Sequence, residues 1–288
     1  MGDEHRAAQF LTVGESGVGH GVYHRGEFAT LDIDARERRR LLRTGELTSP
    51  RKDWFAVRGH APTVAAAVAE GGVLSCVSAL KRYGFWVPPG YPEQHVRSGR
   101  WSAHATTSCR GFSAIPAATT AVDSIAVALE CAAHCMPAED WIAVCDSVQQ
   151  QLGLSAQALR GEMGPLPKYV QSLFDKTDGR SQSGTESIAR VRLRALGFHV
   201  VVQPQITELA RADLRIGQLI IECDSRQYHS DAEAYQTDRT RDRKSTVGGW
   251  LTFRLTWDDI LYGWDEVIED IRAITRAGRH RAGKTTAS

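Results

Sequence analysis

The feature that most constrains the fold of this 288-residue chain is a short hairpin, RADLRIGQLIIECDS, over residues 211–225. A two-residue turn that begins at Gly217 suits it, because glycine supplies the positive φ that such turns need. Pairing about this turn sets Asp213 opposite Glu222, and strand side chains alternate between two faces. One face is therefore apolar, and the other carries Asp213, Arg215, Glu222 and Asp224.

The acidic face predicts a site for a hard divalent cation. Like charges directly opposed destabilise a sheet, and two carboxylates about 5 Å apart repel by roughly 3 kcal/mol at an effective dielectric of about 20. Mg²⁺, Mn²⁺ or Ca²⁺ offsets this repulsion, because hard cations prefer oxygen ligands whereas zinc prefers nitrogen and sulfur. Asp213 and Glu222 are the expected ligands. The structural alternative is a set of acids balanced by Arg211 and Arg215.

The segments around the hairpin predict a mixed sheet with helices on it, within the α/β class. Apolar spacing predicts a helix over residues 184–196 that stops at Gly197. Residues 198–206 predict a strand, residues 232–247 a charged helix, and residues 250–256 a last strand. The expected order is helix, three strands, helix, strand.

Glu186 lies in the first turn of the predicted helix and has two explanations. With Ser183 it forms an S-x-x-E capping box, which alone accounts for a glutamate at this place. A carboxylate there is also suited to a role beside the cation or a water molecule. The spacing leaves both readings open.

The same segment resembles the restriction-endonuclease-like PD-(D/E)XK superfamily, in particular the branch related to very-short-patch-repair (Vsr) endonucleases. The matching residues are Glu186, Asp213 and the E-C-D run from Glu222 to Asp224. The resemblance covers about the last hundred residues and implies an αβββαβ core that hydrolyses phosphodiester bonds. It also implies Mg²⁺ or Mn²⁺ ligation by Glu186, Asp213 and Glu222, with Asp224 as a further catalytic residue.

Two residues depart from the superfamily pattern. The usual lysine, two residues after the third-strand acid, is Asp224 here, so the residue that orients or deprotonates the attacking water is missing. The Vsr-related branch has aspartate at this place but follows it with glycine, where this chain has Ser225. His229 is an alternative proton-transfer residue, because histidine titrates near neutrality, and a solvated loop histidine is the other reading. Arg241 matches the polar face of the next helix and is an expected nucleic-acid contact.

The N-terminal region carries the clearest basic cluster. A helix that starts at Asp34 and stops at Gly45, followed by a basic hairpin, predicts a winged-helix-like DNA-binding region. The expected phosphate contacts are Arg38, Arg39, Arg40, Arg43 and Lys52. The alternative is a solvated helix face with Glu37 and Glu46 as partners. The following stretch, VLSCVSALKRYGFWVPPG, resembles the one after the winged helix in AbiEi-type antitoxins, in which such a domain often precedes a Vsr-like one.

Composition limits the cellular location and the kind of nucleic-acid surface that we expect. The formal charge is +1, so any nucleic-acid surface is a local patch. The six cysteines show no disulfide spacing, the first residues are too polar for a signal peptide, and no apolar run approaches a membrane span, so we expect a cytoplasmic protein without a membrane partner. Cys131, His134 and Cys135 lie in an alanine-rich helical run without a second ligand pair, so we expect them to pack in the core.

Four regions are expected. Residues 1–100 are winged-helix-like, 101–176 are a mixed strand and helical middle region, 177–277 are the nuclease-like domain, and 278–288 are a basic tail. The function expected is a metal-dependent endonuclease acting on DNA, with RNA left open, in phage defence or a toxin–antitoxin setting. The alternative is a nuclease fold without catalysis that regulates by binding DNA or a phage or toxin protein.

Overall fold

The computed structural model describes residues 19–29, 33–98, 108–112, 117–207, 210–224 and 250–281, and the structural statements below concern these residues. The chain divides into two compact units. Unit 1 comprises Met1–Pro137 and Ala158–Ser172, and unit 2 comprises Ala138–Gln157 and Leu173–Ser288. The chain therefore crosses between the units three times, and the expected middle region, residues 101–176, contributes to both.

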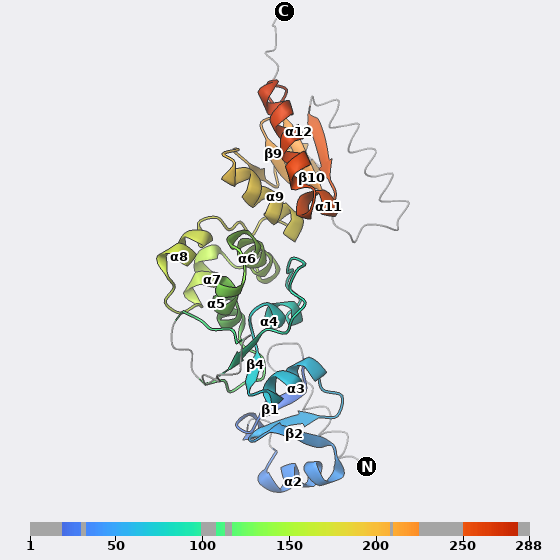
Figure 1. The fold of residues 1–288 in the computed structure, drawn as a ribbon, viewed down its shortest axis with the longest axis vertical. Coiled ribbons are helices and arrows are strands. Elements are labelled where there is room, and N and C mark those ends of the chain that lie inside the picture. The colour runs from blue at the N-terminus through green and yellow to red at the C-terminus, as the bar shows by residue number, and fades with distance from the viewer. Residues whose placement is uncertain are drawn as a thin grey trace, which may run out of the picture. The chain divides into compact units, whose positions relative to one another are not determined.

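The first elements of unit 1 include the helix and hairpin that the sequence predicts (Figure 1). Asp34 caps the helix by accepting hydrogen bonds from the amides of Arg36 and Glu37, each 2.7 Å long. The helix ends at Gly45, which has a φ of 73°. The three strands pair antiparallel in the order β1-β3-β2. The elements are β1 (Val22–His24), the 3-10 helix η1 (Glu27–Ala29), α2 (Ala35–Thr44), β2 (Leu47–Arg51) and β3 (Trp54–Val57).

The remainder of unit 1 packs helices around a second pair of strands. β4 and β5 pair antiparallel, and α4 packs against α5. A side chain at Gly72 would collide with Val96 Cγ1 and lie 2.8 Å from the Arg97 carbonyl oxygen, so the close approach of β5 requires glycine there. The elements are α3 (Pro62–Ala69), β4 (Gly72–Leu74), α4 (Cys76–Arg82), β5 (Val96–Ser98) and α5 (Ile125–Cys135). α7 (Ala156–Gly161) and α8 (Lys168–Phe174) follow, and each crosses a boundary between the units.

Unit 2 contains the predicted hairpin inside a four-stranded mixed sheet. The sheet has the order β11-β10-β9-β6, in which β10 and β11 are parallel and the other pairs antiparallel. Leu219 pairs with Ile216, as predicted, and Gly217 has a φ of 60°. The elements are α6 (Ala138–Leu152), α9 (Gly184–Ala195), β6 (Val201–Val202), β7 (Gln205–Thr207), β8 (Ala210–Arg211), β9 (Leu214–Ile216), β10 (Leu219–Cys223), β11 (Leu251–Leu255), α11 (Trp257–Leu261) and α12 (Trp264–Arg276). The α/β class is therefore confirmed.

Two details of unit 2 differ from the expectation. The strand predicted over residues 198–206 is interrupted, because Gln203 adopts a left-handed φ of 48° between β6 and β7. The face expected to be acidic is not uniformly polar, since Ile220 alternates onto it and is 1% exposed. The helix predicted over residues 232–247 lies outside the described residues.

Helix α6, which the sequence assigned to the middle region, packs against α9 in unit 2. A buried ion pair joins them: Arg190 donates to Asp146 at 2.6 Å, and their side chains are 0% and 1% exposed. Arg190 also donates to the Lys176 carbonyl oxygen, and Asp146 accepts from the Asp178 amide. A buried charge is costly unless it is paired and hydrogen-bonded, so α9 requires α6.

Among the described residues, no helix combines the length and the apolar character that crossing a bilayer demands.

Candidate active site

The candidate active site of unit 2 centres on the carboxylates of Glu186 and Asp213, with Glu222 on the strand next to β9. Glu186 lies in the first turn of α9, Asp213 directly precedes β9, and Glu222 lies in β10. The Gln203 amide nitrogen lies between two of these acids, 3.0 Å from Glu186 Oε2 and 3.5 Å from Asp213 Oδ1. The other Asp213 oxygen accepts from the Cys223 amide at 2.8 Å. Glu186 and Asp213, 27 positions apart in sequence, are therefore joined through one glutamine.

The local contacts of Glu186 separate its two explanations. Ser183 caps α9, since its hydroxyl accepts from the Glu186 amide at 3.2 Å. The reciprocal half of a capping box would bring the glutamate carboxylate to the Ser183 amide. Instead, the carboxylate accepts from the Gln182 amide at 2.9 Å and from Gln203. The Ser183 cap is therefore present, and the Glu186 carboxylate hydrogen-bonds both to the Ser183 side chain and to Gln203.

Negative charge accumulates at this cluster. Burial and then the charge of Asp213 raise the pKa of Glu186 to about 7, against hydrogen bonds from Gln182 and Gln203 that lower it. Burial also raises the pKa of the adjacent Cys223 thiol well above its ordinary value. The negative charges that raise it further are those of Asp213, Glu186, Glu222 and Asp224. All four predicted acids thus act electrostatically on one thiol.

A cavity of about 350 Å³ lies beside the cluster. Two of its lining residues, Gln182 and Gln203, are the ones that donate to Glu186. Two others are Arg180 and Arg211. The Arg180 guanidinium donates to both Asp178 carboxylate oxygens at 2.8 Å, and Arg211 donates to the Gln205 side-chain oxygen at 3.1 Å. The cavity is lined by Arg180, Gln182, Val202, Gln203, Gln205 and Arg211. Guanidinium groups bind phosphate oxygens well, and an anion in this cavity would share Arg180 with Asp178.

Gln203 is the residue of this site that sequence reasoning missed. Its φ of 48° is strained for a residue with a side chain. Three contacts hold it there: its backbone amide donates to the Asp213 carbonyl oxygen at 2.9 Å, and its side chain contacts Glu186 and Asp213. Strained backbone concentrates at functional sites. The available signal was a polar residue before proline at the end of the apolar run 200–202.

Carboxylate oxygens are the ligands that Mg²⁺ and Mn²⁺ prefer. Glu186 and Asp213 offer such oxygens to either side of the Gln203 amide nitrogen. Burial and then the charge of Asp213 disfavour the ionised form of Glu186, which raises its pKa. A cation among these oxygens would favour the ionised form of both acids.

Of the other residues predicted for this site, two lie among the described residues and two lie outside them. Asp224 is exposed, and its amide donates to the Leu255 carbonyl oxygen. Glu222 is partly exposed and stands in register with Arg254 of β11. His229 and Arg241 lie outside the described residues, as does the tract around them.

Of the predicted phosphate contacts of α2 and its hairpin, some contact other residues of the protein and others are exposed. Arg40 forms ion pairs with Glu37 at 2.8 Å and with Glu46 at 3.4 Å, which is the arrangement of the solvated-face alternative. The Arg38 guanidinium lies over the Phe55 ring, 5.3 Å from its centroid. The exposed members of the set are Arg39, Arg43 and Lys52. Within the described part of the chain, these three have no carboxylate partner.

The sequence matches no family model and no curated protein, and the fold matches no solved structure. The two family resemblances therefore stay predictions, and the function is argued from the geometry of the site.

Proposed function

We propose that unit 2 is a metal-dependent nuclease that hydrolyses phosphodiester bonds of DNA. The observation that carries the proposal is the junction of Glu186 and Asp213 through Gln203, beside a cavity lined by Arg180 and Arg211. Acids that hold a cation, next to guanidinium groups that hold a phosphate, are the two parts that such hydrolysis needs.

Each residue has a distinct role in this proposal. When bound by Asp213 and Glu222, Mg²⁺ or Mn²⁺ supplies positive charge that polarises the phosphate and lowers the pKa of a bound water. Arg180 and Arg211 orient the non-bridging phosphate oxygens. Glu186 takes a proton from the attacking water as the water oxygen bonds to phosphorus and the bond to the leaving sugar oxygen breaks. A carboxylate that the bound cation keeps ionised is suited to accept this proton.

Glu186 thereby supplies what the missing superfamily lysine would supply. Asp224, at the lysine position, is exposed and carries no ammonium group. Gln203 is a positioning residue, because its amide fixes the carboxylates of Glu186 and Asp213 relative to one another. In unit 1, Arg39, Arg43 and Lys52 support DNA binding by offering exposed cations to the phosphate backbone.

The test is cleavage of duplex DNA, single-stranded DNA and RNA with Mg²⁺, with Mn²⁺ and with EDTA. Asp213→Asn preserves side-chain shape and removes a ligand charge, so we expect it to abolish metal-dependent cleavage of DNA. Glu269→Gln, which changes an exposed acid on α12, is the matched control and should retain wild-type cleavage. Equal cleavage by Asp213→Asn and the wild type would exclude this site.

The main alternative is a nuclease fold that binds without cleaving, as a regulator in phage defence or a toxin–antitoxin pair. The absent lysine is the observation that favours it. A wild-type protein that cleaves none of the three nucleic acids with either metal would contradict the nuclease proposal and support this alternative.

A further inference from the structure

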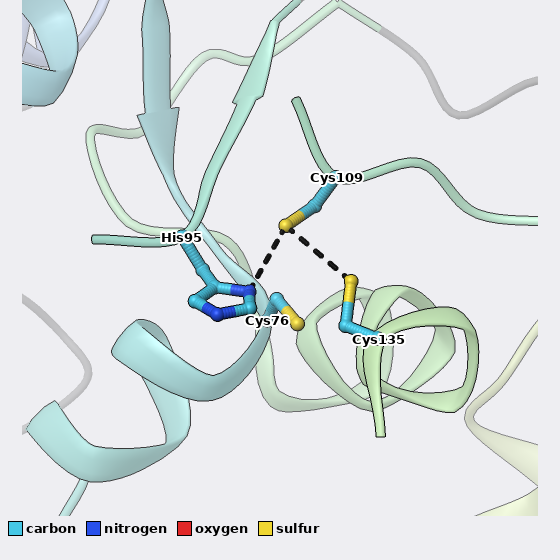
Figure 2. Close-up of side chains that lie close together, drawn as sticks. All are labelled: Cys76, His95, Cys109 and Cys135. Carbon is cyan, nitrogen blue, oxygen red and sulfur yellow. Dashed lines mark hydrogen bonds between the residues drawn. The ribbon is translucent and has the colours of Figure 1, made fainter. Parts of the chain in front are cut away.

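Unit 1 contains a second cluster of metal-ligating side chains, of a different chemical kind. Cys76, His95, Cys109 and Cys135 point toward a common centre (Figure 2). Each offers one ligand atom, and the four atoms all lie within 4.8 Å of one another. The Cys109 and Cys135 sulfur atoms are 3.8 Å apart, and His95 Nδ1 is 3.4 Å from the Cys109 sulfur.

The fold assembles this cluster from four separate places. The pairing of β4 with β5 continues one residue further, where the Ser75 amide donates to the His95 carbonyl oxygen at 3.0 Å. This sets His95 beside Cys76, the first residue of α4. The Cys109 amide donates to the Val96 carbonyl oxygen at 2.8 Å, next to His95. Cys135 is the last residue of α5, which packs against α4.

Two of the six ligand-to-ligand distances match the edges of a tetrahedron around a zinc ion. Bonds of about 2.3 Å to sulfur and about 2.0–2.1 Å to nitrogen place two sulfur ligands about 3.8 Å apart and a sulfur and a nitrogen about 3.6 Å apart. The observed 3.8 Å and 3.4 Å are close to both values. A disulfide would need about 2.05 Å between sulfur atoms. The His95, Cys109 and Cys135 atoms are therefore spaced for a shared ion rather than for a disulfide, and the Cys76 sulfur lies within 4.8 Å of each of them.

Core packing alone does not explain the cluster. Cys76 has a φ of 51°, in the left-handed region that side chains disfavour. Cys131 gives an internal comparison: it lies on the same helix as Cys135, is 0% exposed and stays outside the cluster. His134 stacks on Phe112 with the ring centroids 3.8 Å apart. Of the three residues expected to be core, only Cys135 joins the other ligands.

We propose that Cys76, His95, Cys109 and Cys135 form a structural zinc site. Thiolate and imidazole ligands select zinc over Mg²⁺, and four protein ligands leave no open coordination position for a substrate. The ion links the ends of α4 and α5 to the start of β5 and stabilises unit 1. The site is independent of the proposed nuclease chemistry, which uses oxygen ligands in unit 2.

The first test measures the metal content of the full chain, purified without a metal-affinity step, by inductively coupled plasma mass spectrometry. We expect about one zinc ion per chain. Loss of a group that merely supports a ligand costs about 10–100-fold in metal affinity, so Cys109→Ser and Cys135→Ser should lower zinc content at least about tenfold. Cys131→Ser, which changes a buried cysteine outside the cluster, should keep full zinc occupancy.

A second measurement tests the site in proteins that keep the wild-type fold, in case the serine variants do not fold. Cobalt(II) replaces zinc in the chelator-treated wild type and in Cys131→Ser, and we expect sulfur-to-cobalt charge-transfer absorption together with the visible bands of tetrahedral cobalt. Cys109→His, which replaces one ligand by another, should retain tetrahedral bands and weaken the sulfur band. A zinc-free wild type without a cobalt spectrum would overturn the proposal, as would equal zinc in Cys109→Ser and Cys131→Ser, or a Cys109–Cys135 disulfide in the purified protein.

Discussion

Two single residues with strained backbone mark the two candidate metal sites. Among the described residues, the non-glycine positions with positive φ are Asp53, Cys76 and Gln203. Asp53 lies in the turn between β2 and β3, where such a conformation is ordinary. Cys76 and Gln203 are instead held by the groups around each cluster. A left-handed residue costs about 1–2 kcal/mol. At both sites the backbone conformation that positions the side chains therefore lowers local stability.

The pKa of Glu186 predicts how the metal-free protein responds to pH. The folded state holds this proton more tightly than the unfolded chain, because the pKa rises from 4.5 to about 7. The resulting stabilisation is complete below pH 4.5 and is lost as the pH rises through 7. At about 1.4 kcal/mol per unit, the free energy of unfolding should fall by roughly 3.5 kcal/mol over this range. Glu186→Gln lacks the titrating group and should not show this fall.

Urea denaturation in EDTA at a series of pH values measures the difference between the two proteins. Wild type and Glu186→Gln should have similar stability near pH 4.5, and the variant should be the more stable near pH 8. Parallel pH profiles would mean that Asp213 and burial do not act on Glu186 in this way.

At the scale of elements, Gly72 predicts how closely β5 must approach β4. A methyl group there would meet Val96 and the Arg97 carbonyl oxygen, so Gly72→Ala should displace β5 and lower unfolding stability by about 1–3 kcal/mol. Zinc content should fall with it, because β5 begins next to His95. Gly161→Ala is the control, since a side chain there meets nothing within 4 Å. Thermal unfolding and zinc content of the two variants check the prediction, and equal values would contradict it.

The exposed cations of α2 and its hairpin predict the salt dependence of DNA binding. Replacing Arg39, Arg43 and Lys52 together by glutamine removes three candidate phosphate contacts. The slope of log affinity against log salt should then decrease by roughly 3, with weaker binding to every sequence. Fluorescence anisotropy with duplex DNA in EDTA measures the slope without cleavage.

A control variant removes the same positive charge from other exposed positions of unit 1. These are Arg58, Arg110 and Lys168. If both triple variants change the slope equally, binding depends on overall charge, and the cluster on α2 is a solvated face.

The elements most accessible to sequence reasoning were those with local signals. The hairpin at Gly217, the helix from Gly184 and the capped helix after Asp34 each follow from periodicity, turn chemistry or capping, and all are confirmed. Gln203 was missed because its conformation depends on Asp213, ten positions later. The zinc ligands were missed because no pair shows a short metal-binding spacing: they are separated by 19, 14 and 26 positions (95 − 76, 109 − 95 and 135 − 109). Strand pairing and helix packing, rather than local sequence, bring them together.

At the scale of the whole molecule, the buried Arg190 predicts which fragments fold. A fragment of residues 177–288, cut at the boundary expected from sequence, lacks Asp146 and leaves the Arg190 charge buried without its ion-pair partner. Breaking such a pair costs about 3–5 kcal/mol, so this fragment should not unfold cooperatively. A fragment of residues 138–288 retains α6 and should do so.

Circular dichroism during thermal unfolding compares the two fragments. Asp146→Asn in the full chain should reproduce part of the loss, whereas Asp175→Asn, an exposed change in unit 2, should not. A cooperative transition in the shorter fragment would show that α9 folds without α6.

Because the chain crosses between its units three times, recombination cannot exchange one unit cleanly for another. A single recombination breakpoint exchanges everything on one side of it, and no single position in this chain separates the whole of unit 1 from the whole of unit 2. A breakpoint between residues 138 and 172 would build at least one of the two units from segments of two different parents. A lineage carrying this architecture would tend to pass on both units together, and the sulfur-rich and carboxylate-rich sites would diverge under shared descent rather than by the shuffling of modules.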